Sequence, residues 1–330
     1  MAANAVFIAP LHGLDLHGPT SGRGFELDEG LYIASDSPYY DRLVARHFTE
    51  SLDLRFRVYL QELQLEGIAK PPFLHTARSL PDTTKDLDSS GDMFLATWVY
   101  VNHALWLVKD NSVNFHRCAG SGTLATGRLI PWRGTLISYF FDASGEQHTT
   151  SISLDELRQA RTYLRQLSEM ALHLSSTTSD RGGVLLVKGH RLVRAQFFLM
   201  SARLHAILPL RIAQYVACLE ALVSTDQSEL KHRLCERIAL FLASSGEEQE
   251  RIYDGVSLAY SVRSAVVHGD RVKHEPLRLS DISRDCDDII RALFRKILGD
   301  AELSQLFDEC RTTKDSLDKY FKSKLFRSRR

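Results

Sequence analysis

The sequence predicts an α+β protein in which a β-rich N-terminal region precedes an all-helical C-terminal bundle. Seven of the nine prolines and twelve of the nineteen glycines fall within residues 1–150, and both residue types favour turns over helices. Beyond residue 150, apolar residues recur at helical spacing in one segment after another. The length of 330 residues adds the expectation of two domains.

Short apolar runs place the elements of the first 150 residues. The predicted strands are 5–9, 25–34 and a hairpin over 128–141 that turns near Pro131–Gly134. Ser37 and Pro38 supply an N-cap and an N1 proline for a helix. Residues 67–91, rich in Gly, Pro, Ser and Asp, predict a long loop, whereas residues 92–109 suit either a helix or a buried strand. These elements do not specify a named fold.

The second half predicts helices almost throughout. Ser153 and Glu156 form a capping box that opens a helix ending near Leu174, and a polar linker follows over 175–183. Further helices are predicted at 185–207, 209–224, 229–243, 247–268, 279–298, 300–308 and 313–324. We therefore expect a domain at 1–150, a helix with its linker at 151–184, and a helical domain with a basic tail at 185–330.

The net charge of zero conceals an uneven distribution. Residues 1–150 carry 12 basic and 17 acidic side chains and residues 151–330 carry 29 and 24, so the halves have net charges of −5 and +5. The overall balance excludes a histone-like protein and an acidic disordered chain. The last twelve residues, KYFKSKLFRSRR, hold six basic side chains and no acidic one. Cations interleaved with aromatic rings suit RNA, so Lys322, Lys324 and Arg327 are candidate RNA contacts; a solvated, partly disordered tail is the alternative.

Cysteine usage and hydropathy predict a cytoplasmic protein that does not enter a membrane. Five cysteines with no CxxC pair indicate reduced thiols. The N-terminus lacks the pattern of a signal peptide, and the longest apolar stretch, residues 93–108, is too short to cross a bilayer. His116 and Cys118 lack companions at the spacing of a zinc site, so no metal and no cofactor is predicted.

The most informative stretch is 251–270, RIYDGVSLAYSVRSAVVHGD. Helical spacing places Arg263 on its apolar stripe, together with Val266 and Val267, and this stripe should face protein. A buried guanidinium without a partner is costly, so we expect a carboxylate or a phosphate to meet Arg263. Glu220 shares the apolar stripe of the helix predicted at 209–224, so an Arg263–Glu220 ion pair is the structural alternative.

His268 follows Arg263 by five residues, about 140° further round an ideal helix, so the two side chains do not face each other on one straight helix. Gly269 is typical of the position just after a helix, which places His268 at the helix end. The two side chains can converge if the helix end loosens, or if two copies of the helix meet across a two-fold axis. A lone histidine that interacts with the helix dipole is the alternative.

Three blocks carry a family resemblance: CLEAL at 218–222, LKHRLCERIALFL at 230–242 and YSVRSAVVHGD at 260–270. In this order and spacing they resemble the Apea-like branch of the HEPN superfamily, over about residues 185–300. The resemblance implies an all-α HEPN-type bundle that forms a homodimer, and its R-x4–6-H motif corresponds to Arg263 and His268.

The resemblance also implies a metal-independent endoribonuclease. RNA supplies the 2′-hydroxyl as nucleophile, His268 would move the proton and Arg263 would hold the phosphate. Glu220 would then orient Arg263, and Ser264 stands where the family often has a larger polar residue. The implied role is an RNA-cleaving effector in bacterial antiviral defence or a toxin-type stress response, with RNA and a regulatory protein as partners. The N-terminal domain would sense a trigger or restrain the activity.

Several residues keep two interpretations at this point. Arg237 matches the arginine of the second block, where packing and phosphate contact are the alternatives. The acidic residues Asp281, Asp285, Asp287 and Asp288 are interpreted as solvated charges near a helix start rather than as a cation site. For the protein as a whole, the alternative is a non-catalytic HEPN module that binds a partner or nucleic acid and uses Arg263 and His268 to hold its dimer.

Overall fold

The computed structural model describes residues 3–18, 20–48, 56, 59, 72–80, 84–123, 128–136, 139–175, 191–225, 230–307 and 314–327. The chain forms two compact units, which we call the sheet unit and the helical unit. The sheet unit comprises Met1–Phe140 and Gln147–Leu167, and the helical unit comprises Phe141–Glu146 and Ser168–Arg330. The predicted α+β class is confirmed, with an antiparallel sheet preceding a helical region.

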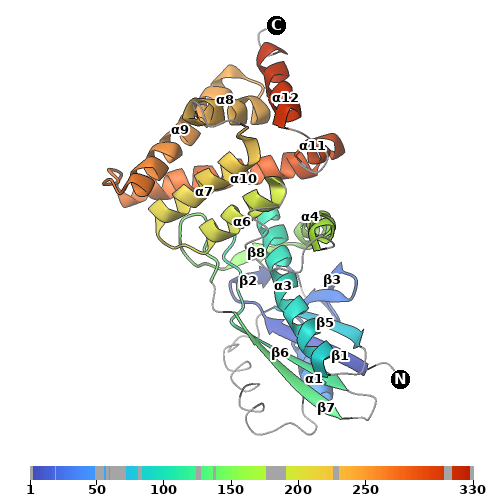
Figure 1. The fold of residues 1–330 in the computed structure, drawn as a ribbon. Helices are drawn as coiled ribbons and strands as arrows, with labels where there is room; N and C mark the ends of the chain where they lie inside the picture. The colour runs from blue at the N-terminus through green and yellow to red at the C-terminus, as the bar shows by residue number, and fades with distance from the viewer. Residues whose placement is uncertain are drawn as a thin grey trace. The chain divides into compact units, whose positions relative to one another are not determined.

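The sheet unit is built on a six-stranded antiparallel sheet (Figure 1) with the strand order β3-β4-β5-β1-β6-β7. Its strands are β1 (Ala3–Pro10), β3 (Phe25–Asp28), β4 (Leu31–Ala34), β5 (Phe73–Leu80), β6 (Arg117–Thr123) and β7 (Leu129–Thr135). A separate parallel pair joins β2 (Leu14–Leu16) to β8 (Thr150–Ile152). The helices of this unit are α1 (Ser37–Phe48), α3 (Thr84–Val108) and the first part of α4 (Leu154–Ser175).

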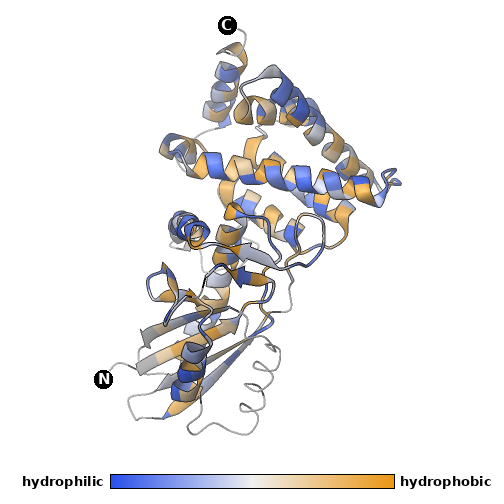
Figure 2. Cartoon of the chain, turned by 180° about the vertical axis from the view of Figure 1, so that it is seen from behind, coloured by the Kyte–Doolittle hydropathy of each residue, from blue (hydrophilic) through white to orange (hydrophobic). Residues whose placement is uncertain are grey.

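Strand β1 lies in the middle of the sheet, and both of its faces are covered. Phe7 stacks on Phe94 of α3 with 5.7 Å between ring centroids. Its neighbours Val6 and Ile8 belong to a different cluster, in which they pack with Phe48 and other side chains of α1. Because successive residues of a strand point to opposite faces, α1 and α3 cover the two sides of the sheet (Figures 1 and 2). This explains why the predicted strand at 5–9 is a continuous apolar run.

Two predictions for the first half are wrong because turns and strands there do not follow composition. The strand predicted over 25–34 is the hairpin β3–β4, with Gly30 in the left-handed region at a φ of 69°. The long loop predicted over 67–91 contains β5 and the first turns of α3. Strand β5 is central and accommodates a polar side chain, since a ring nitrogen of His75 hydrogen-bonds to the Arg23 carbonyl at 2.9 Å.

The hairpin predicted over 128–141 is also wrong, since β7 is a single edge strand. Pro131 is tolerated there because an edge strand has one side without ladder hydrogen bonds. Gly134 is required by packing, because a Cβ at this position would lie 2.4 Å from the Trp132 ring. The ambiguous segment 92–109 is helical and forms most of α3, and the helix predicted from Ser37 is confirmed as α1.

The helical unit consists of amphipathic helices, in which hydrophobic and hydrophilic residues alternate along each helix (Figure 2). They are α6 (Arg191–Arg203), α7 (Leu208–Val223), α8 (Leu230–Leu242), α9 (Gly246–His268), α10 (Pro276–Leu298), α11 (Ala301–Leu306) and α12 (Lys314–Arg327). Each confirms a predicted helix, and the ends that fall within the described residues differ from the predicted ones by a few residues. The capping box is also confirmed, because Ser153 and Glu156 exchange hydrogen bonds of 2.7 and 3.2 Å at the start of α4. All but the first residue of the predicted linker at 175–183 lies outside the described residues.

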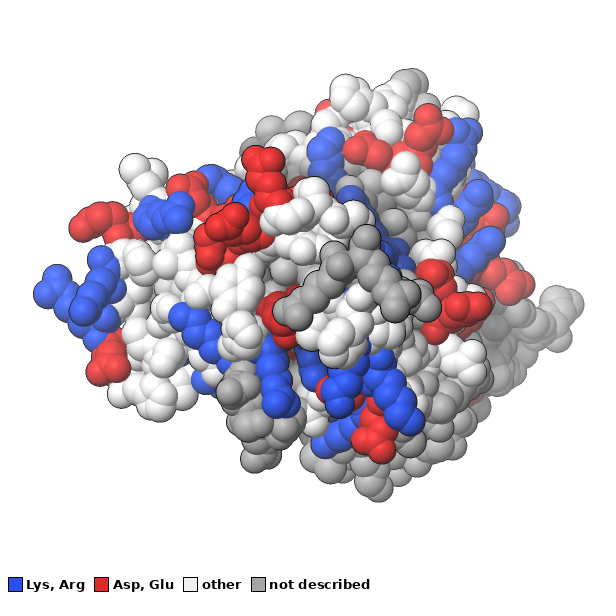
Figure 3. Space-filling view, turned by 90° about the horizontal axis from the view of Figure 1, so that it is seen from above, with Lys and Arg blue, Asp and Glu red and all other residues white. Residues whose placement is uncertain are grey.

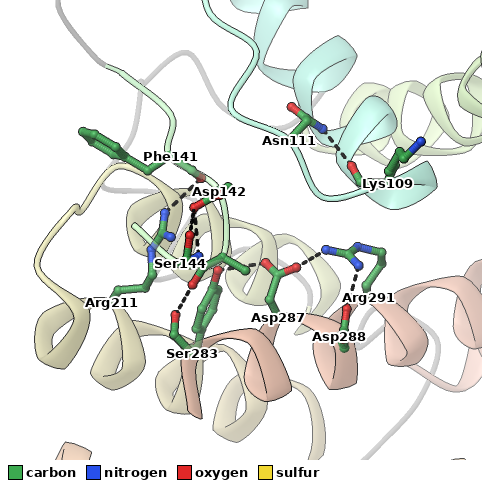
Figure 4. A network of polar contacts seen from close by, with 12 residues as sticks. Lys109, Asn111, Phe141, Asp142, Ser144, Arg211, Ser283, Asp287, Asp288 and Arg291 are labelled. Atoms are coloured by element: carbon green, nitrogen blue, oxygen red, sulfur yellow. Dashed lines mark hydrogen bonds and ion pairs between the residues drawn. The ribbon is translucent and has the colours of Figure 1, made fainter. Parts of the chain in front are cut away.

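The segment Phe141–Glu146 belongs to the helical unit, although the predicted boundary at residue 150 grouped it with the first domain. The Phe141 N–H donates to the Arg203 carbonyl at 2.9 Å, and Arg211 Nη2 donates to the Phe141 carbonyl at 3.0 Å. Ser283 Oγ donates to the Ala143 carbonyl at 2.5 Å (Figure 4). These contacts with α6, α7 and α10 fasten the segment to the helical unit.

The prediction for one of the four aspartates is wrong. Asp287 lies in the middle of α10 and is fully buried. The Tyr215 hydroxyl donates to Asp287 Oδ1 at 2.8 Å, and Arg291 forms an ion pair with its other oxygen (Figure 4). A helix that starts at Pro276 places Asp287 three turns in, on the buried face, rather than near the helix start. Asp281, Asp285 and Asp288 are exposed.

Two further properties bear on the predicted environment. No helix in the described residues is long and apolar enough to cross a membrane. The four cysteines within the described ranges are free and buried: Cys118, Cys218, Cys235 and Cys286. Burial raises the pKa of the Cys218 and Cys286 thiols, which keeps them protonated. Cys310 lies outside the described residues.

Candidate functional site

Helix α9 carries Arg263 and His268. It begins at an N-cap, where Ser245 Oγ accepts a hydrogen bond from the Glu248 N–H at 3.3 Å. The buried stripe that fixes its orientation comprises Ile252, Val256, Ala259 and Val262. The predicted stripe continued instead to Val267, which is 58 % exposed. The buried face of α9 therefore ends at Val262, nearly two turns before the helix does and just beside Arg263.

Arg263 meets Glu220 of α7, as the structural alternative predicts. The distance between Nη2 and Oε2 is 3.5 Å, and the side chains are 27 % and 20 % exposed. The guanidinium also lies over the Tyr260 ring, 5.5 Å from the ring centroid. The ion pair therefore lies at the edge of the core, where solvent still reaches the arginine.

Glu220 is only partly satisfied. Its Oε1 atom is buried and has no hydrogen-bond partner among the described residues. Burial raises the pKa of Glu220, and the positive charge of Arg263 acts in the opposite direction. The environment of Glu220 therefore disfavours its negative charge, and Arg263 only partly compensates for this effect.

His268 lies at the exposed end of α9. Gly269 follows it with a φ of 73°, and the Asp270 N–H closes the helix by donating to the Ala265 carbonyl at 2.8 Å. The predicted role of Gly269 as helix terminator is confirmed. The helix is regular through His268, so it is not loosened. Within the described chain, no hydrogen bond or ion pair joins His268 to Arg263.

Ser264 lines a surface pocket of about 670 Å³. The pocket is formed by α9, the start of α8 and the loop that follows α9. Its lining residues are Lys231, Tyr260, Ser261, Val262, Ser264, Ala265, Asp270, Arg271, Val272, Lys273 and His274. Of these residues, only Ser264 was predicted to belong to a site. The signal available in the sequence was the basic run RVKH at 271–274, which follows Gly269 and Asp270 at the end of α9.

Arg237 has the packing role that was one of its two alternatives. Its Nη1 donates to the Val223 carbonyl at 2.7 Å and to Thr225 Oγ1 at 2.9 Å, and its Nη2 pairs with Asp318 at 2.5 Å. Burial lowers the pKa of Arg237, and Asp318 counteracts this effect. Both terminal nitrogens are therefore engaged within the protein.

The basic C-terminal segment is helical through residue 327, so the alternative of a solvated, partly disordered tail is wrong about disorder in this part, although Lys322 is exposed to solvent. Phe321 is buried in α12. Lys322 Nζ forms an ion pair with Asp318 at 3.0 Å, which lowers the pKa of that carboxyl. Lys324 Nζ lies 5.5 Å from the centroid of the Tyr320 ring. The side chain of Arg327 lies outside the described residues.

A second pocket, of about 490 Å³, lies where α8 and α12 meet. Its charged lining residues have both signs: Arg233, Glu236, Arg237, Lys314, Asp315, Asp318 and Lys322. The three carboxylates offset the cations, so this surface is a weaker candidate for binding a polyanion than the sequence suggested. RNA contact by Lys322, Lys324 and Arg327 stays a prediction.

Comparison with protein-family models, curated proteins and solved structures finds no match to this chain. Within the described residues, no group of three or more His, Cys, Asp or Glu side chains is placed to hold a metal ion. The arrangement around α9 is therefore interpreted from its own chemistry.

Proposed function

We propose that this protein is an endoribonuclease that acts as a homodimer through its helical unit and uses Arg263 and His268 without a metal ion. The observation that carries the proposal is the position of Arg263. Its guanidinium is held by Glu220 at 3.5 Å yet keeps 27 % of its side chain exposed, so it can meet a phosphate without losing its support. An exposed imidazole ends the same helix.

The chemistry needs few protein groups because the RNA provides the nucleophile. His268 takes the proton of the 2′-hydroxyl or protonates the leaving 5′-oxygen. Arg263 holds the phosphate and offsets the charge that develops on its oxygens. The products are a 2′,3′-cyclic phosphate and a 5′-hydroxyl. Glu220 orients the arginine, and Ser264 is a small supporting residue on the neighbouring face.

Two copies of α9 are required for this reaction, because one regular helix keeps Arg263 and His268 apart. A two-fold axis near the end of α9 would place the histidine of each copy beside the arginine of the other. Val267 and Leu277 support a contact there, since they are 58 % and 84 % exposed on either side of the turn between α9 and α10. Large exposed apolar side chains of this kind favour association.

The proposed biological role is that of an RNA-cleaving effector in the bacterial cytoplasm, serving antiviral defence or a toxin-type stress response. The sheet unit would sense a trigger or hold the activity in check, with a regulatory protein as a further partner. This part of the proposal is supported by the three sequence blocks that resemble Apea-like HEPN proteins.

A second candidate function is a non-catalytic module that binds a partner or nucleic acid. The observation that favours it is that Arg263 already has a carboxylate partner, Glu220. In this case the arginine and His268 only hold the dimer.

The experiment that separates the two is RNA cleavage in EDTA by the purified protein, beside Arg263→Ala, His268→Ala and the control His232→Ala. His232 is an exposed histidine of α8 that hydrogen-bonds to the Tyr253 hydroxyl. We expect cleavage by the wild type and the control, and losses of about 10²- to 10⁴-fold for the other two. Equal cleavage by all four proteins would overturn the assignment. No cleavage by the wild type, together with monomers for Arg263→Ala, would establish the non-catalytic module.

A further inference from the structure

We propose that the 670 Å³ pocket beside α9 binds the phosphodiester backbone of single-stranded RNA, as an anion site adjoining Arg263. This inference rests on the proposed function. It adds the surface that binds the part of the RNA strand next to the reacting phosphate. The residues that define the site are Lys231, Tyr260, Ser261, Ser264, Arg271 and Lys273.

The charge of the pocket is predominantly positive. Lys231, Arg271 and Lys273 line it together with a single carboxylate, Asp270. All three cations are exposed, so they can reach a ligand. In the space-filling view, the end of the helical unit that holds the turn between α9 and α10 shows basic side chains at its tip with acidic side chains beside them (Figure 3). A predominantly cationic lining raises the local concentration of an anion such as a phosphodiester.

Lys231 is held in place before any ligand binds. Its Nζ donates to Ser261 Oγ at 3.2 Å, and that hydroxyl donates to the Ser257 carbonyl at 3.0 Å. Lys231 also lies in the first turn of α8, which has no acidic residue. A cation is unfavourable at a helix N-terminus, and an anion bound there offsets both charges. Lys231 therefore lowers the stability of α8 by itself, but its position is suitable for binding a phosphate.

Tyr260 connects the pocket to the candidate reaction site. It lines the pocket, and the same ring lies 5.5 Å from the guanidinium carbon of Arg263. The Ser264 hydroxyl also lines the pocket and offers a hydrogen bond to a phosphate oxygen, whereas the Ser261 hydroxyl donates to the Ser257 carbonyl and holds Lys231. Cations with an aromatic ring and hydroxyl groups form the usual surface for a single strand. A strand with its reacting phosphate at Arg263 therefore continues into the pocket.

The test measures binding separately from cleavage. The probe is a fluorescein-labelled 20-nucleotide RNA in which 2′-fluoro groups replace the 2′-hydroxyls, so that it has no nucleophile. Anisotropy titrations at several salt concentrations compare the wild type with Lys231→Gln/Lys273→Gln. The control Arg251→Gln/Arg284→Gln removes two exposed charges from α9 and α10 outside the pocket.

We expect the lysine variant to bind the probe about tenfold more weakly at low salt than the wild type. Its slope of log K against log[salt] should be smaller by about 1.4, which corresponds to two lost phosphate contacts on a single strand. The control should bind like the wild type. Equal losses of affinity in both double variants would overturn the proposed site, because they would reflect only the net charge of the protein. Unchanged binding by the lysine variant would also overturn it. Cleavage of unmodified RNA by the wild-type protein is measured in parallel. Its absence would contradict the proposed function without bearing on whether the pocket binds RNA.

Discussion

Arg237 and Arg263 lie on neighbouring helices of the same unit, and the difference between them separates a structural arginine from a candidate functional one. Arg237 is 9 % exposed and donates to a carbonyl, a hydroxyl and a carboxylate. Arg263 is 27 % exposed, and its polar contact is one carboxylate at 3.5 Å. The first has its donors committed within the protein, whereas the second has donors to spare.

Other buried arginines of the helical unit resemble Arg237. Arg191 Nη1 donates to the Ser224 carbonyl at 2.7 Å, at the C-terminal end of α7. Arg211 Nε donates to the Ala202 carbonyl at 3.1 Å, near the end of α6. These guanidinium groups supply donors to carbonyls that have no partner within their own helix. An arginine that closes a helix end is a structural element, and Arg263 does not have this role.

Removing Arg237 should therefore cause the largest loss of stability. Arg237→Met keeps an apolar stem but removes the donors to the Val223 carbonyl and Thr225 Oγ1, and leaves Asp318 with Lys322 as its cation. We expect the free energy of unfolding to fall by about 2 kcal/mol, because the Val223 carbonyl and Thr225 Oγ1 lose their donor and the ion pair with Asp318 is lost. Urea denaturation followed by circular dichroism measures this. A loss below about 1 kcal/mol would show that Arg237 is not fully engaged in solution.

The matching change at Arg263 should cost much less. Arg263→Met loses one partly solvated ion pair and the contact with Tyr260, for which we expect about 1 kcal/mol in the same urea measurement. RNA cleavage should show the reverse order, with the larger loss at Arg263. A stability loss at Arg263 equal to that at Arg237 would make both arginines structural and would favour the non-catalytic module.

The helices of the second half could be predicted because their apolar periodicity and caps are local properties. Gly269 marked the end of α9, and the structure confirms it. The first half was less predictable because its turns are decided by tertiary packing. Gly134 suggested a turn, yet it lies inside β7 to make room for Trp132. Gly269 thus meets a local requirement, the end of a helix, whereas Gly134 meets a non-local one, the space occupied by Trp132.

For the candidate site, the sequence predicted several of the residues involved. It did not predict how many hydrogen-bond and ion-pair partners each of them has. The stripe pattern correctly paired Arg263 with Glu220. It could not distinguish Arg237, because the acceptors of Arg237 come from α7 and from Asp318, 81 residues later. Nor could it anticipate the pocket around Lys231, since a tether between α8 and α9 is a tertiary contact. The number of hydrogen-bond and ion-pair partners of each side chain depends on contacts between distant parts of the chain, and these are known only from the folded structure.

Double-mutant cycles would sharpen the comparison. We expect a coupling energy of about 1.5 kcal/mol between Arg237 and Asp318, and about 0.5 kcal/mol between Arg263 and Glu220. The second value should fall more as salt is raised, because Arg263 is more exposed to ions than Arg237 is. Urea denaturation of the single and double variants at two salt concentrations gives both energies. Equal coupling would remove the distinction between the two arginines.

The smallest expected effect is a change with pH that depends on Glu220. Burial raises the pKa of this carboxyl above its ordinary value of 4.5, so the folded state binds its proton more tightly than the unfolded state does. The resulting stabilisation is fully present below pH 4.5 and is lost as the pH rises through the folded pKa. The unfolding free energy of the wild type, relative to Glu220→Gln, should therefore decrease between acidic and neutral pH. An increase would mean that Arg263 outweighs burial at Glu220, and the arginine would then be more firmly bound, and less available to a phosphate, than its exposure indicates.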